Sequence, residues 1–412
     1  MCQWWRRIPQ EPENKVSRKG MAEESSSGKK LTIGVPRETS PNERRVALTP
    51  DGVKKYVAAG VTVLVEKDAG KDAFISDATF ENAGAKIVDE TAGIYKYSDL
   101  ILKVQKPTKE EVDHMQPGST LIAFLSPMVD TDFVKHLQER KITSLSMDAI
   151  PRTTRAQYMD ALSSQATVGG YKAVLIAAYE LPKFFPLLTT AAGNIPPAKV
   201  LIIGAGVAGL MAIGTARRLG AVVEAYDARS VVKEQIESLG GKYVEIDTGA
   251  DLAGAGGYAK EATDEILRRQ QEGLAERAAK SDVIITTAAV PGRPAPRLIP
   301  ATTVERMAPG SVIVDLAAET GGNCELTEKG KTVQRHGVTI VGTLNLPSTL
   351  AVHSSQMYSK NLQNLLALMI DKDGQFTLDM NDDIIANTVI TMSGNVIHEG
   401  TKQRLAPASA PA

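Results

Sequence analysis

The chain has 412 residues, of which 43% are hydrophobic and 23% charged, and its formal net charge at pH 7 is −1. This length predicts two or three domains, and this composition is that of an ordinary soluble globular protein. The near-zero charge argues against binding to nucleic acid or to an anionic membrane surface, and two cysteines are too few for a disulfide framework.

The two ends of the chain differ in composition from the rest. Residues 1–30 are polar and lack the apolar core of a secretory signal, so we expect a disordered N-terminal extension, with Met21 as a natural start. Residues 401–412 are rich in Ala and Pro and predict a flexible tail.

From residue 31 onward, short strand-like runs alternate with helix-like runs. The first predicted strands are residues 31–35, 61–65, 100–104, 121–125 and 142–147, with helical patterns such as 51–59 and 130–140 between them. This alternation predicts a parallel sheet with helices on both faces.

A polar segment follows the last of these strands. It holds Arg152, Gln157, Asp160 and Ser163 beyond the carboxyl end of a strand, where open α/β sheets bind their ligands. These side chains can hydrogen-bond the amide and ribose of a nicotinamide nucleotide. They are equally typical of a polar helix start with Asp160 or Ser163 as its N-cap, and the pattern alone does not separate the two interpretations.

A second α/β unit begins near residue 198 and holds the most informative run of the chain. A strand at 200–203 leads into Gly204, Ala205, Gly206, Val207, Ala208 and Gly209, and a helix continues to Leu219. The first glycine permits a tight turn, the second lets the backbone approach a pyrophosphate, and the third lets the helix pack on its strand. The helix N-terminus adds free N–H groups and a positive dipole end, so we predict a dinucleotide site.

Asp227 ends the next strand, about 20 residues past the turn, where an acid binds the adenosine ribose of such sites. A carboxylate there favours NAD over NADP because it repels a 2′-phosphate, whereas Arg229 leaves room for the opposite preference.

Further strands at 243–246, 283–287, 312–316 and 338–341 complete a full dinucleotide-binding domain. The Gly- and Ala-rich segment 247–259 predicts a mobile loop that closes over ligand, with a passive loop as the alternative. Long helical patterns flank the unit at 157–180, with Gly169–Gly170 as a weak point, and at 348–370.

We therefore predict an α/β protein of two Rossmann-like, doubly wound domains with mainly parallel sheets, the second inserted in the first. Residues 31–160 and 346–400 form the first domain, and residues 161–345 form the NAD-binding domain. The cleft between them is the expected ligand site.

The positions of the histidines do not predict a metal site or a catalytic histidine. None lies in a metal-ligand spacing or beside a nucleophile motif, so no metal is expected. His114 and His136 fall in helical surface patterns and are predicted to be solvated.

Several separated motifs resemble the alanine dehydrogenase/nicotinamide nucleotide transhydrogenase superfamily. They are Pro36-Arg37-Glu38, the RVALTP run at 45–50 and the LKVQKP run at 102–107. Segments 155–165, 190–193 and 318–323 narrow the resemblance to the NAD(H)-binding component, domain I of the alpha subunit, of the proton-translocating transhydrogenases.

The resemblance implies roles for particular residues. Arg152, Gln157, Asp160 and Ser163 would position the dihydronicotinamide, with Gln157 facing the second nucleotide. The implied cofactor-binding residues are Gly204, Ala205, Gly206, Val207, Ala208, Gly209, Asp227, Ala228, Arg229, Gly257 and Tyr258 of the mobile loop, Thr287, Ala288, and Asn345 on the nicotinamide side.

The implied reaction is a direct hydride transfer between NADH and NADP⁺, which needs orientation and water exclusion but no acid or base. Since one dinucleotide site is credible here, NADP(H) is expected on a partner subunit. The resemblance also implies a homodimer, membrane-spanning partner subunits that carry the proton path, and a place on the cytoplasmic side of the inner membrane through those partners.

Two other functions stay open. An NAD-dependent amino-acid dehydrogenase of the alanine dehydrogenase type needs an acid/base beside its substrate. Lys103 and Arg45 match that family's lysine and substrate-binding arginine, although Ser126 stands at its histidine's place and both cations can be structural charges paired with acids such as Glu38. A non-catalytic NAD-binding regulator is the third hypothesis.

Overall fold

A computed structural model describes residues 30–249, 251–252, 254, 260, 262–289 and 294–406. The predicted N-terminal extension up to residue 29, Gly257 and Tyr258 of the predicted mobile loop, and residues 407–412 lie outside the described residues.

The first of two large sheets has eight strands in the order β17-β16-β6-β5-β4-β1-β2-β3. Six are parallel, and β16 and β17 add an antiparallel edge beside β6. The strands are β1 (Thr32–Val35), β2 (Thr62–Glu66), β3 (Lys86–Val88), β4 (Leu100–Gln105), β5 (Thr120–Phe124), β6 (Thr143–Ser146), β16 (Val389–Met392) and β17 (Asn395–Val396).

Both faces of this sheet are covered, as expected for parallel strands. Alternate residues of β4 enter two different apolar clusters, Leu100 and Leu102 with α1 and α11, and Ile101 with α3, α4 and α5. The helices are α1 (Pro50–Ala58), α2 (Asp77–Asn82), α3 (Thr91–Tyr97), α4 (Lys109–Asp113), α5 (Thr131–Glu139), α11 (Ala351–Leu366), α12 (Asp383–Thr388) and α13 (Glu399–Leu405), with 3-10 turns η1 (Lys71–Ala73) and η2 (Gln157–Met159).

The second sheet has seven strands in the order β11-β10-β9-β12-β13-β15-β14. All neighbours are parallel except β14, which forms an antiparallel edge hairpin with β15. The strands are β9 (Lys199–Ile203), β10 (Val222–Tyr226), β11 (Lys242–Tyr243), β12 (Val283–Thr286), β13 (Val312–Asp315), β14 (Thr332–Arg335) and β15 (Val338–Val341). The strand order reverses between β9 and β12, which is where such sheets bind nucleotides.

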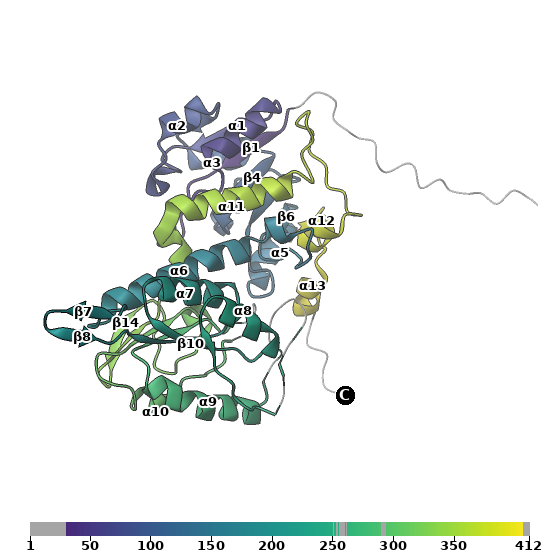
Figure 1. Ribbon diagram of the computed structural model, residues 1–412. Helices are drawn as coiled ribbons and strands as arrows, with labels where there is room; N and C mark the ends of the chain where they lie inside the picture. Colours follow the sequence, from purple (N-terminus) through teal and green to yellow (C-terminus); the bar gives the residue numbers. More distant parts are fainter. Residues whose placement is uncertain are drawn as a thin grey trace, which may run out of the picture.

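Helices α6 and α7 pack on one face of this sheet, and α9 and α10 on the other. The elements are α6 (Ala161–Glu180), α7 (Val207–Arg218), α8 (Lys233–Ser238), α9 (Asp264–Ala279), α10 (Ala301–Val304) and the 3-10 turns η3 (Ser230–Val232), η5 (Ala318–Thr320) and η6 (Leu346–Leu350). A separate hairpin, β7 (Leu188–Thr190) with β8 (Gly193–Ile195), projects from this lobe (Figure 1).

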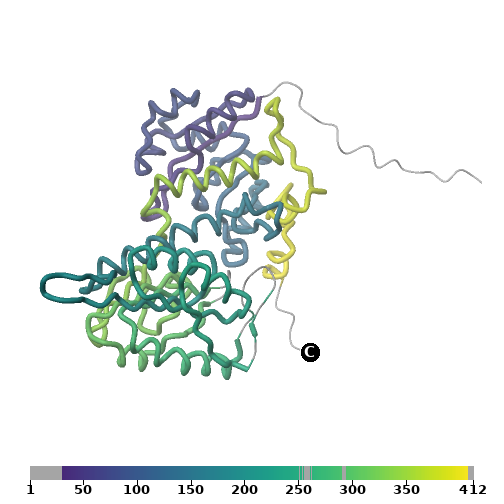
Figure 2. Tube along the Cα trace, in the orientation of Figure 1, coloured from purple at the N-terminus to yellow at the C-terminus, as the bar shows by residue number. Residues whose placement is uncertain are grey.

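The chain leaves the first sheet through α6, builds the second sheet, and returns through η6 and α11 to add β16 and β17 to the first (Figure 2). The prediction of two doubly wound, mainly parallel α/β units, one inserted in the other, is therefore confirmed.

Helix α6 corrects the prediction of a weak point at Gly169–Gly170, because it runs unbroken through both glycines. A Cβ on Gly170 would lie 2.0 Å from the carbonyl oxygen of Ala208. Glycine is present there because α6 and α7 pack at close range, with Ala173 and Ala177 buried along the same seam.

Two smaller expectations also need correction. Residues 401–405, predicted as part of a flexible tail, lie in α13, where Thr401 is buried and its N–H donates to Nδ1 of His398. His136 is half-buried rather than solvated and lies 3.1 Å from the carboxylate of Asp113, because α5 packs against α4 on that side.

Candidate functional site

The glycine turn after β9 shows three different uses of glycine. Gly204 has a φ of +96°, and a Cβ on it would lie 2.6 Å from Oγ1 of Thr287. A Cβ on Gly209 would lie 1.8 Å from the carbonyl oxygen of Gly204, so this residue sets the distance between helix and strand. Gly206, the N-cap of α7, would place its Cβ where no heavy atom of the described residues comes within 4 Å. The face of the turn at Gly206 is thus open, and the first N–H groups of α7 point toward it.

The strand beside the turn fixes it from the other side. Thr287 donates its N–H to the carbonyl of Ile203 (2.8 Å) and its hydroxyl to that of Gly204 (3.0 Å). Ala288 exchanges two hydrogen bonds with the buried Asn323 side chain, of 3.0 and 2.8 Å. Thr287 and Ala288 therefore lie at the carboxyl end of β12, next to the turn, at the point where the strand order reverses.

Asp227 lies at the carboxyl end of β10, 7% exposed, and faces the same turn. Its Oδ2 accepts from the N–H of Ala205 (2.7 Å), and its Oδ1 accepts from the N–H of Arg229 (2.9 Å). The guanidinium of Arg229 donates to both carboxylate oxygens, each at 2.8 Å. These hydrogen bonds raise the pKa of Arg229. Ala228, between the two, is half-buried.

The polar segment before α6 is a capping structure. Oδ1 of Asp160 accepts from the N–H of Ser163 (2.9 Å) and Oδ2 accepts from its hydroxyl (2.6 Å), so Asp160 is the N-cap of α6. The N-cap interpretation is thus confirmed for Asp160. Arg152 and Gln157 are exposed on the preceding loop, which starts from the carboxyl end of β6.

A buried polar network joins the two lobes. The guanidinium of Arg45 binds both carboxylate oxygens of Glu43 (2.7 and 2.6 Å), the amide oxygen of Gln165 on α6 (2.9 Å), and the amide oxygen of Asn345 (3.1 Å). The Nδ2 group of Asn345 donates to Glu43 in return (2.9 Å), as does the amide of Gln105. Asn345, whose φ of +47° is left-handed, lies where the chain leaves the second lobe for η6.

The charge state of this network follows from its contacts. Burial opposes ionisation of Glu43, but the hydrogen bonds and charge of Arg45 outweigh it and lower the pKa of Glu43 to about 2. The network therefore holds an ion pair, and it links the loop before α1 to α6 and to Asn345.

A second buried cluster surrounds Lys103 on β4. Its Nζ lies 3.6 Å from the carboxylate of Glu38 and 4.0 Å from that of Glu111. Glu38 also accepts the N–H groups of Val104 and Gln105 (2.6 and 3.2 Å), and burial raises its pKa despite the nearby ammonium. Lys103 therefore pairs with Glu38, as in the alternative in which both cations are structural charges, whereas Arg45 pairs with Glu43. Ser126 is exposed, with a φ of +49°.

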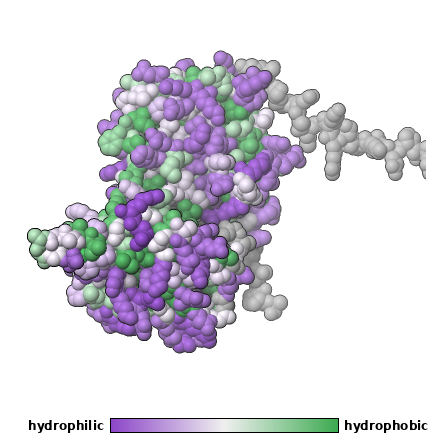
Figure 3. Space-filling model, in the orientation of Figure 1, coloured by the Kyte–Doolittle hydropathy of each residue, from purple (hydrophilic) through white to green (hydrophobic). Residues whose placement is uncertain are grey.

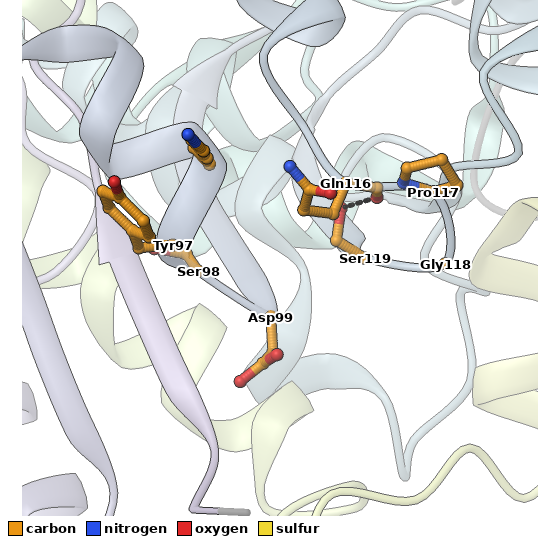
Figure 4. A pocket seen from close by; sticks show the side chains of 8 residues that line it. Tyr97, Ser98, Asp99, Gln116, Pro117, Gly118 and Ser119 are labelled. Carbon is orange, nitrogen blue, oxygen red and sulfur yellow. Dashed lines mark hydrogen bonds between the residues drawn. The ribbon is translucent and has the colours of Figure 1, made fainter.

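A groove of about 460 Å³ lies at the amino-terminal edge of the first sheet, opposite the edge where the strands lead into the loops of Glu38 and Arg152 (Figure 4). Asp99 and Ser119 line it and directly precede β4 and β5, and the hydroxyl of Ser119 donates to the carbonyl of Gln116. Lys103 lies four residues beyond Asp99, about 13 Å further along β4, so this groove is separate from the cluster around Lys103 and Glu38. It holds none of the residues that the sequence predicts for the site.

Two further properties of the described residues bear on function. They contain no helix long and apolar enough to span a membrane. They also contain no group of His, Cys, Asp or Glu side chains that could hold a metal ion.

Sequence reasoning missed Glu43, Gln165 and Asn323. Each is a buried polar residue whose partners lie on other elements, such as the Asn345–Glu43 and Asn323–Ala288 pairs. In the sequence, each is a polar residue inside or beside an apolar run. This pattern indicates that a buried side chain needs a hydrogen-bond partner, but it does not identify the partner.

Comparison with known proteins identifies relatives along most of the chain. Residues 34–169 match the family model "Alanine dehydrogenase/PNT, N-terminal domain", and residues 173–399 match "Alanine dehydrogenase/PNT, C-terminal domain". The chain is 49% identical to the NAD(P) transhydrogenase subunit alpha of Haemophilus influenzae over 89% of this chain and 72% of that protein. It is 45% identical to an NAD(P) transhydrogenase subunit alpha protein of Rhodospirillum rubrum over 89% of this chain and 98% of that protein.

Solved structures give the same result. The transhydrogenase from Sinorhizobium meliloti matches with a TM-score of 0.81 at 42% identity, covering 89% of this chain and 100% of that one. An L-alanine dehydrogenase matches with a TM-score of 0.75 at 27% identity, covering 91% of this chain and 99% of that one.

Proposed function

The chain belongs to the alanine dehydrogenase/PNT family, and from that premise we propose that it is the NAD(H)-binding component of a transhydrogenase that passes hydride directly between NADH and NADP⁺ held by a partner subunit. The resemblance found in the sequence is confirmed, and the chain is an NAD(P) transhydrogenase of the alpha-subunit type. The open face of the glycine turn carries the proposal for the cofactor, because the N-terminus of α7 offers its first N–H groups there and Gly206 leaves room for a pyrophosphate.

We propose that NAD(H) binds along the carboxyl edge of the second sheet. The N–H groups that follow Gly206 would bind the pyrophosphate, and Asp227 would bind the adenosine ribose. For that, the carboxylate of Asp227 must exchange part of its contact with Arg229 for a ribose hydroxyl. Thr287 and Ala288 would wall the site at β12, Ala228 and Arg229 at β10, and Gly257, Tyr258 and Asn345 would complete it.

The proposed domains are residues 31–160 with 346–400 and residues 161–345, and the nicotinamide end of the site would lie between them. Arg152, Gln157, Asp160 and Ser163 would hold the ring there, with Gln157 toward the partner's nucleotide. When bound, NADH supplies a hydride from C4 of its ring, and C4 of NADP⁺ receives it. The two electrons and the proton move together as hydride, so no side chain needs to accept or release a proton.

The contacts of Arg45 and Lys103 favour this function over an amino-acid dehydrogenase. Arg45 is buried and donates to Glu43, Gln165 and Asn345, so a substrate carboxylate would have to displace one of these contacts. Lys103 lies between two carboxylates and is buried. Ser126 cannot serve as a base near neutral pH without a partner. Higher identity to transhydrogenases than to the L-alanine dehydrogenase points the same way.

We propose that two copies of this chain form a homodimer through α6 and the projecting hairpin. Large apolar or aromatic side chains are exposed there, and Figure 3 shows pale to green residues along the hairpin and green residues at its base. The exposed large side chains are Tyr171 and Tyr179 on α6, Phe184 and Leu187 on the segment that joins α6 to the hairpin, and Ile195 on β8. Sedimentation of the wild-type chain and of a Leu187→Asp variant tests the dimer, which the variant should dissociate.

The names of the relatives describe subunits, which supports an assembly with further subunits. We propose that an NADP(H)-binding subunit and membrane-spanning subunits are the partners, that proton translocation takes place in the latter, and that this chain lies on the cytoplasmic side of the inner membrane through them.

Mixing the purified chain with an NADP(H)-binding subunit of a transhydrogenase tests the function. NADH-dependent reduction of an NADP⁺ analogue, followed by absorbance, is expected only with both proteins present. Reduction of NAD⁺ by L-alanine with this chain alone would instead establish the dehydrogenase. Tight NADH binding without any transfer to the analogue would establish a regulator.

A further inference from the structure

The loop that carries Gln157 is hydrogen-bonded to helix α11, which lies about 200 residues further along the chain. The carbonyl oxygen of Tyr158 accepts two side-chain amides from α11, Asn361 Nδ2 and Asn364 Nδ2, each at 2.9 Å. Asn361 also accepts the hydroxyl of Ser164 in the first turn of α6 (2.7 Å), so it ties the loop to the helix that follows.

Arg155, two residues before Gln157, makes a second attachment. Its two terminal nitrogens bind the two carboxylate oxygens of Asp382, both at 2.8 Å, and one of them also binds Asp383. Asp382 is the N-cap of α12, because its Oδ1 accepts the N–H groups of Ile384 and Ile385. The hydrogen bonds from Arg155 lower the pKa of Asp382 to about 2, which keeps the carboxylate charged.

These contacts lie on either side of Gln157. The intervening residues alternate, with Ala156 and Met159 buried in the core of the first lobe and Gln157 and Tyr158 exposed. The backbone is thus pinned at residue 155, at residue 158 and by two buried side chains, while the side chain of Gln157 points outward.

We propose that Arg155, Asp382 and Asn364 are positioning residues for hydride transfer, which hold the loop so that Gln157 and Arg152 orient the nicotinamide. This inference rests on the proposed function. The Arg155–Asp382 pair contributes little to global stability because Arg155 is exposed and Asp382 only half-buried, and the Asn364–Tyr158 hydrogen bond is exposed as well. Orientation is more demanding, since a displacement of about 1 Å at a reacting centre costs up to about 100-fold in rate.

The test uses the Arg155→Ala/Asn364→Ala double variant with the matched control Arg268→Ala. Arg268 on α9 is also an exposed arginine in carboxylate pairs, with Glu265 and Glu272, but it lies far from the loop in the second lobe. At saturating NADH and with an NADP(H)-binding subunit present, the double variant should transfer hydride about tenfold more slowly, with the Kd for NADH within about twofold of wild type. The control should change neither value.

Two further measurements separate the possible failures. Hydrogen exchange at residues 153–159 should be faster in the double variant than in wild type, and Arg155→Lys, which keeps the charge but loses the fork, should fall between them. Unchanged exchange, or a wild-type transfer rate in the double variant, overturns the positioning role. Parallel losses of NADH binding, transfer and thermal stability overturn it as well, since they indicate a general structural role. Absence of transfer by the wild-type pair contradicts the proposed function itself, whatever the exchange shows.

Discussion

The glycine turn offers a paired test in which the structure predicts opposite consequences for two similar substitutions. In Gly206→Ala the new methyl group meets no heavy atom of the described residues within 4 Å, and the φ of −74° suits alanine. Its free energy of unfolding should stay within about 1 kcal/mol of wild type, the size of an N-cap effect.

NADH binding by Gly206→Ala should weaken by about 100-fold. The methyl group projects about 1.5 Å from the backbone into the space assigned to the pyrophosphate, so phosphate oxygens can no longer approach to the roughly 2.9 Å of a hydrogen bond. Loss of one or two charge-assisted N–H bonds costs about 2.7 kcal/mol, which is that factor in Kd.

In Gly209→Ala, by contrast, the main effect should be a loss of unfolding free energy rather than a direct loss of contacts with NADH. Its methyl group would lie 1.8 Å from the carbonyl oxygen of Gly204, so α7 must move away from β9. Forced overpacking of this kind costs about 3 kcal/mol of unfolding free energy. Urea unfolding and NADH fluorescence titration on both variants provide the assay. Wild-type NADH affinity in Gly206→Ala would refute the assignment of this turn to the pyrophosphate.

Three other predictions follow from named contacts. The lowered pKa of Glu43 means that its ion pair with Arg45 contributes stability above the ordinary glutamate pKa of 4.5, and this contribution is lost as the pH falls toward 2. Between about pH 7 and pH 3, urea unfolding should therefore show about 2 kcal/mol more acid loss in wild type than in Glu43→Gln, and equal losses would contradict this prediction. Asp227→Asn should weaken NADH binding about tenfold while narrowing the gap between NADH and NADPH affinities, because the repelling charge is gone; an unchanged NADH/NADPH ratio in a fluorescence titration would count against Asp227 as the ribose acid. Gly170→Ala should destabilise the chain by about 3 kcal/mol, because its methyl group would lie 2.0 Å from the carbonyl oxygen of Ala208; a wild-type unfolding midpoint would disprove the close packing of α6 on α7.

Local sequence patterns predict the glycine turn, but they do not predict contacts between residues that lie far apart in the chain. Gly204, Gly206 and Gly209 can be assigned because each glycine has a backbone reason that a spacing reveals. The prediction for the Gly169–Gly170 pair is wrong because helix propensity is a local quantity, whereas the reason for glycine is the carbonyl of Ala208 on another helix.

The same limit explains what the sequence could not supply at the candidate site. For the polar segment before α6, the sequence favoured neither nucleotide binding nor helix capping. The structure shows that Asp160 is the N-cap of α6. The partners of the loop, Asn364 and Asp382, lie more than 200 residues away from it, and no periodicity connects them. Similarly, the contact between Asn345 and Glu43 arises only when the chain returns to the first sheet.

The most direct measurement of the central claim uses NADH deuterated at both C4 positions, mixed with this chain and an NADP(H)-binding subunit carrying an NADP⁺ analogue. Direct transfer without a proton-carrying side chain predicts that the reduced analogue contains one full deuterium, in ordinary water, as read by mass spectrometry. Protium from solvent at that position, or no reduced analogue at all, would contradict the account.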